Sequence, residues 1–424
     1  MRTPRWAWTL AIERFLRTSV KGVPMTVRSL PARGRRRIAL YSHDAQGLGH
    51  VRRNLAVAGA LSHMSPSPDI LLLTGAPEAS ALPRPPGCDI VGLPGMAKDQ
   101  GGRYRARHLS VPVSELVRLR AATIDAALRA FDPDLLVVDR HPWGFRGELE
   151  PVLESLAERT RVVLGLRDVL DEPARARQEW IDDRADLAVR RWYHQVWYYG
   201  DPRVHDATTE LDLPPGMVVP TGYLARGRHR RQHTGPGRPV EKRYVLGLVG
   251  GGADGWALAR AFASAPMPVG HLGVLVTGPR MPHAQRAELH AIARARPELR
   301  VFEFVDQIDA WLDDAGAVVA MGGYNTVCEV LACGAPLLVV PRTRPRSEQL
   351  VRAERLAGAG LLDVLHPDRL GAAELGGWLA AAVDRPAVSG SEIDLDGLAR
   401  LPALATALIG AAPDRDHEEA HDVA

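Results

Sequence analysis

The chain has 424 residues, of which 46% are hydrophobic and 24% charged, as is typical of a globular protein with two domains. It contains no run of eighteen apolar residues, which excludes a membrane-spanning helix. Its three cysteines, Cys88, Cys328 and Cys333, are too few for a disulfide framework and have no histidines clustered near them. We therefore expect a reducing compartment and no metal site.

The first 35 residues form a basic arm. Residues 1–37 carry ten Lys or Arg and one acid, so this segment has a charge of +9 and the rest of the chain −6. The arm mixes Trp6 and Trp8 with arginines, and a basic amphipathic segment can lie on an anionic membrane surface. A disordered tail, or a true start at Met25, explains the same residues. We predict a cytoplasmic protein, with peripheral contact at the inner face of the membrane as an alternative, and no nucleic-acid partner.

From Arg37 onward, short apolar segments alternate with helical patterns. The strand-like segments are RIALYSHD, DILLLTG, DIVGLPG, DLLVVDR, RVVLGLRD, HQVWYYGD and MVVPTGYLA, and the helix-like ones span 50–62, 113–131, 147–158 and 173–191. Strands that are apolar on both faces and alternate with helices predict a parallel sheet covered on each side.

A basic segment with Gly and Pro, residues 226–240, interrupts this alternation and is typical of a linker. A second alternating series follows, with strands in RYVLGLVGGG, HLGVLVTG, RVFEFVDQ, AVVAMGG, PLLVVPR and LLDVL. The predicted fold is therefore α/β, with two doubly wound Rossmann-like domains, 36–225 and 241–390, that face a central cleft. A helix over 391–410 follows, and the polar residues 411–424 are expected to be disordered.

The loop after the first strand carries the main catalytic candidate. Residues 46–53 read QGLGHVRR, and loops at the carboxyl ends of parallel strands face the cleft. Gly47 and Gly49 would let the backbone approach a ligand closely, and the ordinary pKa of His50 suits a general base near neutral pH. Alternatively, His50 caps the helix or binds a phosphate. Arg52 stands where a dinucleotide-binding loop has its third glycine, so that motif is not matched here.

Two further strand ends of the first domain belong at the same cleft. Asp139 ends the strand DLLVVDR, and Arg167 lies at the end of RVVLGLRD. By the switch-point rule, both are candidate substrate contacts. The alternative is Arg–Asp pairing that only orders the loops.

Residues 250–255 read GGGADG and match G-x-G-x-x-G after the strand YVLGLV. The next strand ends without an acidic residue for a ribose hydroxyl, so NAD binding is not expected. Gly251 and Gly252 instead suit a loop that faces the cleft and is available to a diphosphate or a substrate. The alternative is a tight strand-to-helix turn.

A second glycine turn predicts a phosphate site. Gly322 and Gly323 follow the apolar strand AVVAM and precede the helical pattern YNTVCEVLAC. Such a turn brings backbone N–H groups to a helix start, where phosphate binds readily. Thr326 and Glu329 also have the spacing of a capping box with Thr326 as the N-cap, which explains these two side chains without a ligand.

Glu348 and Gln349 follow the next strand, after the basic loop PRTRPRS. A carboxylate and an amide side by side offer both acceptors and donors to the hydroxyl groups of a sugar. The glycine turn, Glu329 and this pair, taken in order, suit a ligand with a diphosphate, a ribose and a sugar.

The order GGYNTVCEVLACGAPLLVVPR and then RPRSEQ resembles the donor-binding half of GT-B glycosyltransferases, specifically the glycosyltransferase family 28 C-terminal domain. This family includes the peptidoglycan N-acetylglucosaminyltransferase. With GLGHVRR in the first half, the resemblance covers roughly residues 36–385, as two α/β domains would. The combined pattern is most similar to a bacterial subgroup of glycosyltransferases.

The resemblance implies a role for each matching residue. His50 would be the general base on the acceptor hydroxyl. The implied donor contacts are the diphosphate at Gly322, Gly323, Tyr324, Asn325 and Thr326, the ribose at Glu329, the sugar at Glu348 and Gln349, and the nucleobase at the backbone of Val305, with Gly251 and Gly252 nearby. The residues assigned to the acceptor side are Gly47, Gly49, Arg52, Asp139 and Arg167.

The implied reaction is transfer of a hexose or N-acetylhexosamine from a UDP-sugar to an acceptor, which is a glycan, a lipid-linked sugar or a small molecule. The mechanism would be inverting and independent of metal, because nothing resembles the Asp-x-Asp metal motif of the other large glycosyltransferase fold, and no cofactor is implied. Two alternatives use the same fold: a sugar-nucleotide hydrolase or 2-epimerase, and a non-catalytic protein that binds nucleotide sugars.

Overall fold

The structure is a computed structural model that describes residues 35–43, 48–98, 103–156, 159–214, 216–226, 242–305, 308–387 and 393–410. The described residues from Arg35 onward form one compact unit. Three predicted segments fall outside the described residues: the basic arm before Arg35, the linker after Arg226, and the tail 411–424. Within the described ranges, no helix is long and apolar enough to cross a bilayer.

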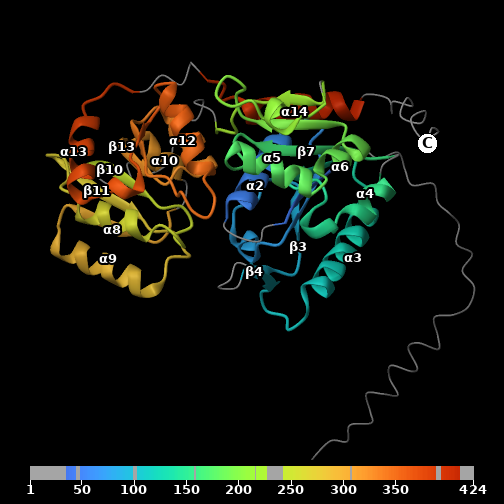
Figure 1. The fold of residues 1–424 in the computed structure, drawn as a ribbon, viewed down its shortest axis with the longest axis horizontal. Coiled ribbons are helices and arrows are strands. Elements are labelled where there is room, and N and C mark those ends of the chain that lie inside the picture. The colour runs from blue at the N-terminus through green and yellow to red at the C-terminus, as the bar shows by residue number, and fades with distance from the viewer. Residues whose placement is uncertain are drawn as a thin grey trace, which may run out of the picture. The chain divides into compact units, whose positions relative to one another are not determined.

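The first half of the chain forms a seven-stranded sheet in the order β3-β2-β1-β6-β7-β8-β9, with every neighbouring pair parallel (Figure 1). Its strands are β1 (Arg37–Ser42), β2 (Asp69–Thr74), β3 (Cys88–Gly92), β6 (Leu135–Asp139), β7 (Arg161–Arg167), β8 (Gln195–Tyr199) and β9 (Val218–Pro220). A separate antiparallel pair joins β4 (Met96–Lys98) to β5 (Tyr104–Ala106). The helices that follow these strands are α2 (Gly49–Leu61), α3 (Val113–Phe131), α4 (Glu150–Leu156), α5 (Pro173–Asp182), α6 (Ala185–Trp192) and α7 (Ala207–Leu211).

The second half forms a six-stranded parallel sheet in the order β12-β11-β10-β13-β14-β15. Its strands are β10 (Arg243–Leu248), β11 (His271–Val276), β12 (Leu299–Phe302), β13 (Ala315–Ala320), β14 (Leu337–Val339) and β15 (Asp363–Val364). Its helices are α8 (Trp256–Ser264), α9 (His283–Ala295), α10 (Ile308–Asp313), α11 (Tyr324–Cys333), α12 (Glu348–Gly358) and α13 (Ala372–Ala382). Both halves thus have the parallel, helix-covered sheets that the alternating pattern predicts.

Each sheet is buried on both faces. In β1, Ile38 and Leu40 enter one apolar core, while Ala39 and Tyr41 enter another, because successive side chains of a strand point to opposite faces. In the first half, α3, α4, α5 and α6 pack on one face and α2 on the other. In the second half, α8, α9 and α13 pack on one face and α10, α11 and α12 on the other. One core includes side chains from both sheets, so the two halves share buried surface.

The last helix, α14 (Gly397–Gly410), returns to the first half and packs against α2 (Figure 1). The backbone N–H of Tyr223 donates to the carbonyl of Asp394 at 2.7 Å, and that of Asp394 donates to Asp201 at 2.9 Å. These bonds tie the segment before α14 to the end of the first sheet. The limits of the two domains, 36–225 and 241–390, stay a prediction.

Candidate functional site

A pocket of about 420 Å³ opens where the strand order of both sheets reverses. The first sheet reverses between β1 and β6, and the second between β10 and β13. In doubly wound sheets, ligands bind outside the carboxyl ends of the strands at such switch points. Residues that follow all four strands line this pocket, and its volume is that of a small-molecule site.

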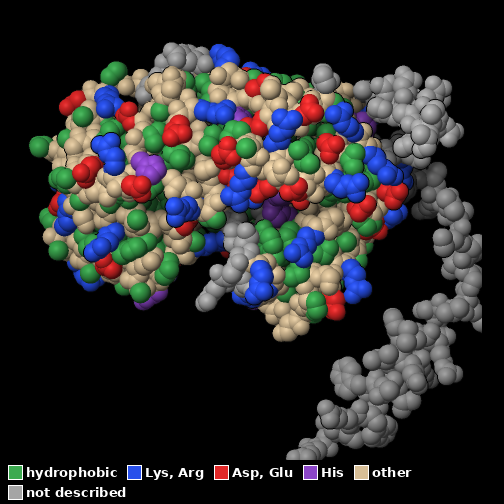
Figure 2. All heavy atoms as spheres, viewed as in Figure 1, with side chains coloured by type: hydrophobic (Ala, Val, Ile, Leu, Met, Phe, Trp, Pro, Cys, Tyr) green, Lys and Arg blue, Asp and Glu red, His purple; other side chains and the backbone are tan. Residues whose placement is uncertain are grey.

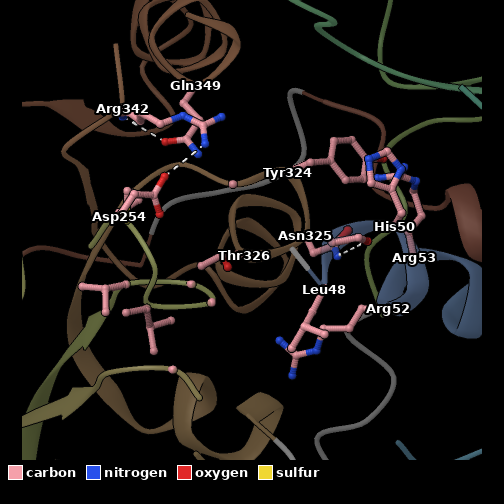
Figure 3. A pocket seen from close by; sticks show the side chains of 18 of the residues that line it. Leu48, His50, Arg52, Arg53, Asp254, Tyr324, Asn325, Thr326, Arg342 and Gln349 are labelled. Atoms are coloured by element: carbon pink, nitrogen blue, oxygen red, sulfur yellow. Dashed lines mark hydrogen bonds and ion pairs between the residues drawn. The ribbon is translucent and has the colours of Figure 1, made fainter. Parts of the chain in front are cut away.

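His50 lies in the first turn of α2 and lines the pocket (Figure 3). Its Nδ1 is hydrogen-bonded to Oδ2 of Asp139, the last residue of β6. Asp139 also accepts hydrogen bonds from Nε and Nη2 of Arg53, at 3.1 and 2.7 Å. Burial would raise the pKa of Asp139, but the charge of Arg53 and the contact with His50 outweigh it and hold that pKa well below its usual value. Asp139 is therefore ionised at neutral pH.

The ionised carboxylate decides which nitrogen of His50 carries the proton. Nδ1 faces an acceptor, so it holds the hydrogen, and Nε2 is left with a lone pair. Nη2 of Arg53 also lies 2.9 Å from Nδ1, but it donates to both oxygens of Asp139, which are the better acceptors. The pair is thus built as a general base and the carboxylate that orients it. Asp139 is 2% exposed and holds His50 and Arg53, which differs from the acceptor contact predicted for it.

Two further histidines, His43 and His141, lie beside His50. The ring of His43 meets those of His50 and His141 edge-on, with centroids 5.3 and 4.7 Å apart. Burial, helped by neighbouring cationic groups, lowers the pKa of both His43 and His141 well below 6.5, so both are neutral at pH 7. His43 is 7% exposed, and its Nδ1 has no hydrogen-bond partner among the described residues. In the part of the chain that the structure describes, no His, Cys, Asp and Glu group is arranged to hold a metal ion.

Helix α11 starts earlier than predicted. Its N-cap is Gly323 and its first residue is Tyr324, so the capping box expected with Thr326 as N-cap is wrong. No side chain caps the helix, and the first backbone bond within it runs from Val327 N–H to the Gly323 carbonyl. An uncapped helix start leaves backbone N–H groups for an anion such as a diphosphate.

The two glycines before α11 have different tasks. Gly322 has a φ of +84°, and a Cβ there would lie 2.6 Å from Cγ1 of Val339, so the turn requires glycine. Its carbonyl accepts a hydrogen bond from Nη1 of Arg352 at 3.1 Å. Gly323 lines the pocket, and nothing lies within 4 Å of the position that a Cβ would take. The space in front of the helix start is therefore open to a ligand.

Two side chains of the predicted phosphate loop are engaged with the first half of the chain. Tyr324 is 3% exposed; its hydroxyl donates to the Tyr199 carbonyl at 2.9 Å and accepts from the N–H of Leu224 at 3.0 Å. Nδ2 of Asn325 donates to the Gly49 carbonyl at 3.1 Å (Figure 3). Tyr324 can thus offer a diphosphate only its backbone N–H.

Glu329 lies beyond Thr326 on α11, and both line the pocket together with Val305 and Phe304. Burial, and then the charge of Asp309, raises the pKa of Glu329 to about 7. Phe304 is 46% exposed, so its ring is available to a ligand. The predicted ribose and base contacts therefore share one pocket with the helix start.

Glu348 and Gln349 begin α12 and line the same pocket. Nη2 of Arg342 donates to Oε1 of Glu348 at 2.5 Å, and the backbone N–H of Arg342 donates to Oε1 of Gln349 at 2.9 Å. Nη1 of Arg342 forms an ion pair with Asp254 at 3.0 Å (Figure 3). The other oxygen of Glu348 is buried and has no partner among the described residues. Burial opposes ionisation, but the charges of Arg167 and Arg342 outweigh it and lower the pKa of Glu348. A charged oxygen of Glu348 and the amide nitrogen of Gln349 remain for a ligand.

The glycine loop after β10 contributes backbone to the pocket. Gly250 and Gly251 line it. Gly252 does not line it; its φ is +89°, and a Cβ there would collide with the Thr277 carbonyl. Of the predicted pair, Gly251 reaches the pocket, whereas Gly252 allows the loop to pack against the end of β11.

The residues assigned to the acceptor side are spread over the pocket. Gly49 and Arg167 line it, and so does Arg140, which follows Asp139 directly at the end of the same strand. Arg52 is exposed and lies close enough to Glu329 for its charge to act on that carboxyl group, which places it beside the donor residues. Gly47 lies outside the described residues.

Comparisons with known proteins agree with this geometry. Residues 272–376 match the glycosyltransferase family 28 C-terminal domain. The chain is 27% identical over 356 residues to the UDP-N-acetylglucosamine--N-acetylmuramyl-(pentapeptide) pyrophosphoryl-undecaprenol N-acetylglucosamine transferase of Solidesulfovibrio magneticus, which covers 80% of this chain and 87% of that protein. Among solved structures, it is similar to the glycotransferase of kitacinnamycin (TM-score 0.55, 16% identity, 89% of this chain and 97% of that one) and to MurG of Acinetobacter baumannii (TM-score 0.51, 14% identity, 88% and 98%).

Two parallel sheets with a pocket at both switch points, together with these matches, define a glycosyltransferase of the GT-B fold. The part of its second half that matches the glycosyltransferase family 28 C-terminal domain is residues 272–376. The predicted fold class, the family resemblance and the enzyme class are confirmed.

Proposed function

We propose that this glycosyltransferase transfers a hexose or N-acetylhexosamine from a UDP-sugar to an acceptor hydroxyl, with inversion at the anomeric carbon. One observation carries the proposal: His50, which Asp139 orients, and the uncapped start of α11 line the same pocket. A base for the acceptor and an anion seat for the leaving group are the two requirements of glycosyl transfer. The S. magneticus relative is named for transfer from UDP-N-acetylglucosamine, which supports a UDP-sugar as donor.

The donor residues suit the parts of a UDP-sugar in order along the pocket. Phe304 offers a ring face to the base beside the backbone of Val305, and Glu329 accepts hydrogen bonds from the ribose. The diphosphate meets the backbone N–H groups at the start of α11 and the positive end of its dipole. The free oxygen of Glu348 and the Gln349 amide bind hydroxyl groups of the sugar.

In the proposed reaction, Nε2 of His50 takes the proton of the acceptor hydroxyl as its oxygen attacks the anomeric carbon. The bond from that carbon to the diphosphate breaks, and UDP leaves with the electron pair. Asp139 stabilises the imidazolium that forms. Attack from the side opposite the leaving group inverts the anomeric carbon. The α11 start and Arg52 meet the charge of the departing diphosphate, so the proposal requires no metal.

The acceptor is a glycan, a lipid-linked sugar or a small molecule. Peripheral membrane contact through residues 1–37 stays a prediction, because the arm before Arg35 lies outside the described residues.

A nucleotide-sugar panel tests the proposal. Ligand at a hundred times its Kd adds about 2.7 kcal/mol to folding stability, so the preferred UDP-sugar should raise the unfolding temperature and the matching GDP- and TDP-sugars should raise it less. The purified protein is then incubated with that donor, with and without an acceptor mixture. Faster UDP release with acceptor supports transfer. Equal release in both, or conversion of the donor to its epimer, would instead show a hydrolase or 2-epimerase.

A further inference from the structure

Three of the six arginines that line the pocket are neutralised by carboxylates. The pairs with N–O distances of 3.0 Å or less are Arg53 with Asp139, Arg342 with Asp254 and Glu348, and Arg346 with Asp171 and Glu179. Arg140 and Arg167 also line the pocket, but among the described residues no carboxylate lies within ion-pair distance of either guanidinium. Arg167 lies near enough to Glu348 for its charge to lower the pKa of that carboxyl group, but neither Arg140 nor Arg167 has a carboxylate paired with it among the described residues.

Arg140 and Arg167 lie at the ends of neighbouring strands. Arg140 directly follows β6 and Arg167 is the last residue of β7, and the register pairs Asp139 with Gly165. The backbone N–H of Arg140 donates to the Gly165 carbonyl at 2.9 Å, with Arg140 at a φ of +70°. Residues other than glycine seldom adopt this conformation, and such strain is found mainly at functional sites. The fold thus holds Arg140 in a costly conformation beside Asp139.

The side chain of Arg167 has few partners of its own. Its Nη2 reaches the Leu170 carbonyl at 3.5 Å, the limit of a hydrogen bond, and its Nε is buried without a partner among the described residues. In the same pocket, the unpartnered Nδ1 of His43 is a second buried polar atom. Buried polar groups are normally satisfied, so these atoms indicate a missing ligand.

The electrostatics of Arg140 and Arg167 also favour a bound anion. Burial, and then the charge of Arg346, lowers the pKa of Arg140; burial, and then the charge of Arg140, lowers that of Arg167. Both remain cations at neutral pH. Two cations removed from water near each other repel, and an anion between them would offset that cost. On the outer face shown in Figure 2, by contrast, basic and acidic side chains are interspersed over both halves.

We infer that Arg140 and Arg167 form a subsite for an anionic group, a phosphate or a carboxylate, carried by the acceptor near the hydroxyl that His50 deprotonates. The inference rests on the proposed function and adds to it the charge of the acceptor. The acceptor is favoured over the donor because both arginines belong to the sheet that carries Asp139, whereas the donor residues other than Arg52 follow strands of the second sheet. Neutral His43 and His141 beside the arginines can hydrogen-bond hydroxyl groups without adding charge.

Arginine-selective labelling with phenylglyoxal, read by mass spectrometry, tests this on the wild-type protein. UDP is kept saturating so that the donor phosphate seat is filled, and the probes are inorganic phosphate and acetate. At ten times its Kd, a bound probe should slow labelling of Arg140 and Arg167 about tenfold, because about one site in eleven is free. Labelling of Arg118, an exposed arginine of α3, should be unchanged and serves as the control. Protection by phosphate or by acetate tells which anion the subsite takes.

The outcomes separate this inference from the proposed function. If UDP does not raise the unfolding temperature, the proposed function fails. If UDP binds but neither anion protects the two arginines, the subsite is refuted and the proposed function stands. If UDP alone protects them, they bind the donor diphosphate, and the assignment to the acceptor is overturned. Arg140→Gln and Arg167→Gln should each abolish the protection at the other arginine, while Arg118→Gln should leave it intact.

Discussion

Nδ1 of His50 and the carboxylate of Asp139 are hydrogen-bonded although 89 positions separate them in the chain. Strands β1 and β6 are neighbours in the first sheet, so α2, which follows β1, starts beside the end of β6. Arg53, one turn further along α2, neutralises the same carboxylate at 2.7 Å. The carboxylate thereby orients the imidazole and keeps the proton on Nδ1, which leaves Nε2 as the base.

Asp139→Asn should separate catalysis from donor binding. The amide cannot stabilise the imidazolium, so UDP release should fall on the order of 10²- to 10⁴-fold. The affinity for UDP should stay the same, because the donor residues lie in the second half. Loss of the charge also leaves Arg53 buried without its partner, which should cost about 3 kcal/mol of folding stability. Turnover and UDP-induced thermal shift, measured on the same preparation, check both expectations; unaltered turnover would remove Asp139 from the mechanism.

Glu329 should make folding stability depend on pH. Its pKa is about 7 in the folded protein and 4.5 as a free side chain. A raised pKa means that its contribution is complete below pH 4.5 and is lost as the pH rises through 7. Glu329→Gln stays neutral and lacks this loss, so its advantage over the wild type should be small at pH 5 and should rise by pH 8 to the order of 1–2 kcal/mol after solvent screening.

Urea unfolding of both proteins at the two pH values checks this, and every other titrating group is common to both. An equal difference at pH 5 and pH 8 would contradict the raised pKa. The same carboxylate is proposed to bind the ribose, so affinity for a UDP-sugar should be weaker in Glu329→Gln at pH 8.

The buried pair of Arg352 and Asp168 should stabilise the phosphate loop. Arg352 donates to both oxygens of Asp168 at 2.7 Å, and its third nitrogen holds the Gly322 carbonyl. Arg352→Met leaves Asp168 charged, buried and unpaired, so it should cost about 3–5 kcal/mol. The double variant with Asp168→Leu should cost less than Arg352→Met alone.

The exposed pair of Arg129 and Asp125 provides the control, and Arg129→Met should cost about 0.5 kcal/mol or less. Urea unfolding of the three variants and the wild type measures these losses of folding stability. Similar losses for the exposed and the buried pair would show that Arg352 contributes only as a surface residue does.

Gly322 and Gly323 provide a matched test of the phosphate seat. Gly322→Ala forces a side chain into positive φ and against Val339, so it should lower folding stability by about 1–3 kcal/mol. Gly323→Ala has room for its Cβ and should leave stability nearly unchanged. Its methyl group would point into the pocket, however, so UDP affinity should fall. Isothermal titration with UDP measures this affinity. If Gly323→Ala binds UDP as tightly as the wild type does, the diphosphate does not bind at the start of α11.

The arrangement of strands and helices could be predicted from the sequence because the central strands of both sheets are apolar on both faces, as in a parallel sheet covered by helices. The start of α11 could not. The local pattern favours Thr326 as N-cap, but the hydroxyl of Tyr324 is held by Tyr199 and Leu224, from distant parts of the chain. Those buried contacts keep Tyr324 in the first turn and override the local capping preference.

The pairing of the charged residues of the site also depends on contacts between distant parts of the chain. The sequence predicts Asp139 and Arg167 as strand ends at the pocket. Arg167 lines the pocket, and Asp139 is hydrogen-bonded to His50, which lines it. Which arginine pairs with which carboxylate depends on sheet order and on contacts between the halves, so the roles of Arg53 and Arg140 were not predictable. His43 was missed because a single histidine after a strand has no motif.

The transfer mechanism is tested most directly by His50→Ala. UDP release from the UDP-sugar that gives the greatest thermal shift is measured with saturating acceptor, and the Kd for UDP is measured on the same preparation. A dedicated base predicts an unchanged Kd and a loss of turnover on the order of 10²- to 10⁴-fold. Turnover equal to that of the wild type would contradict the assignment of His50 as the base.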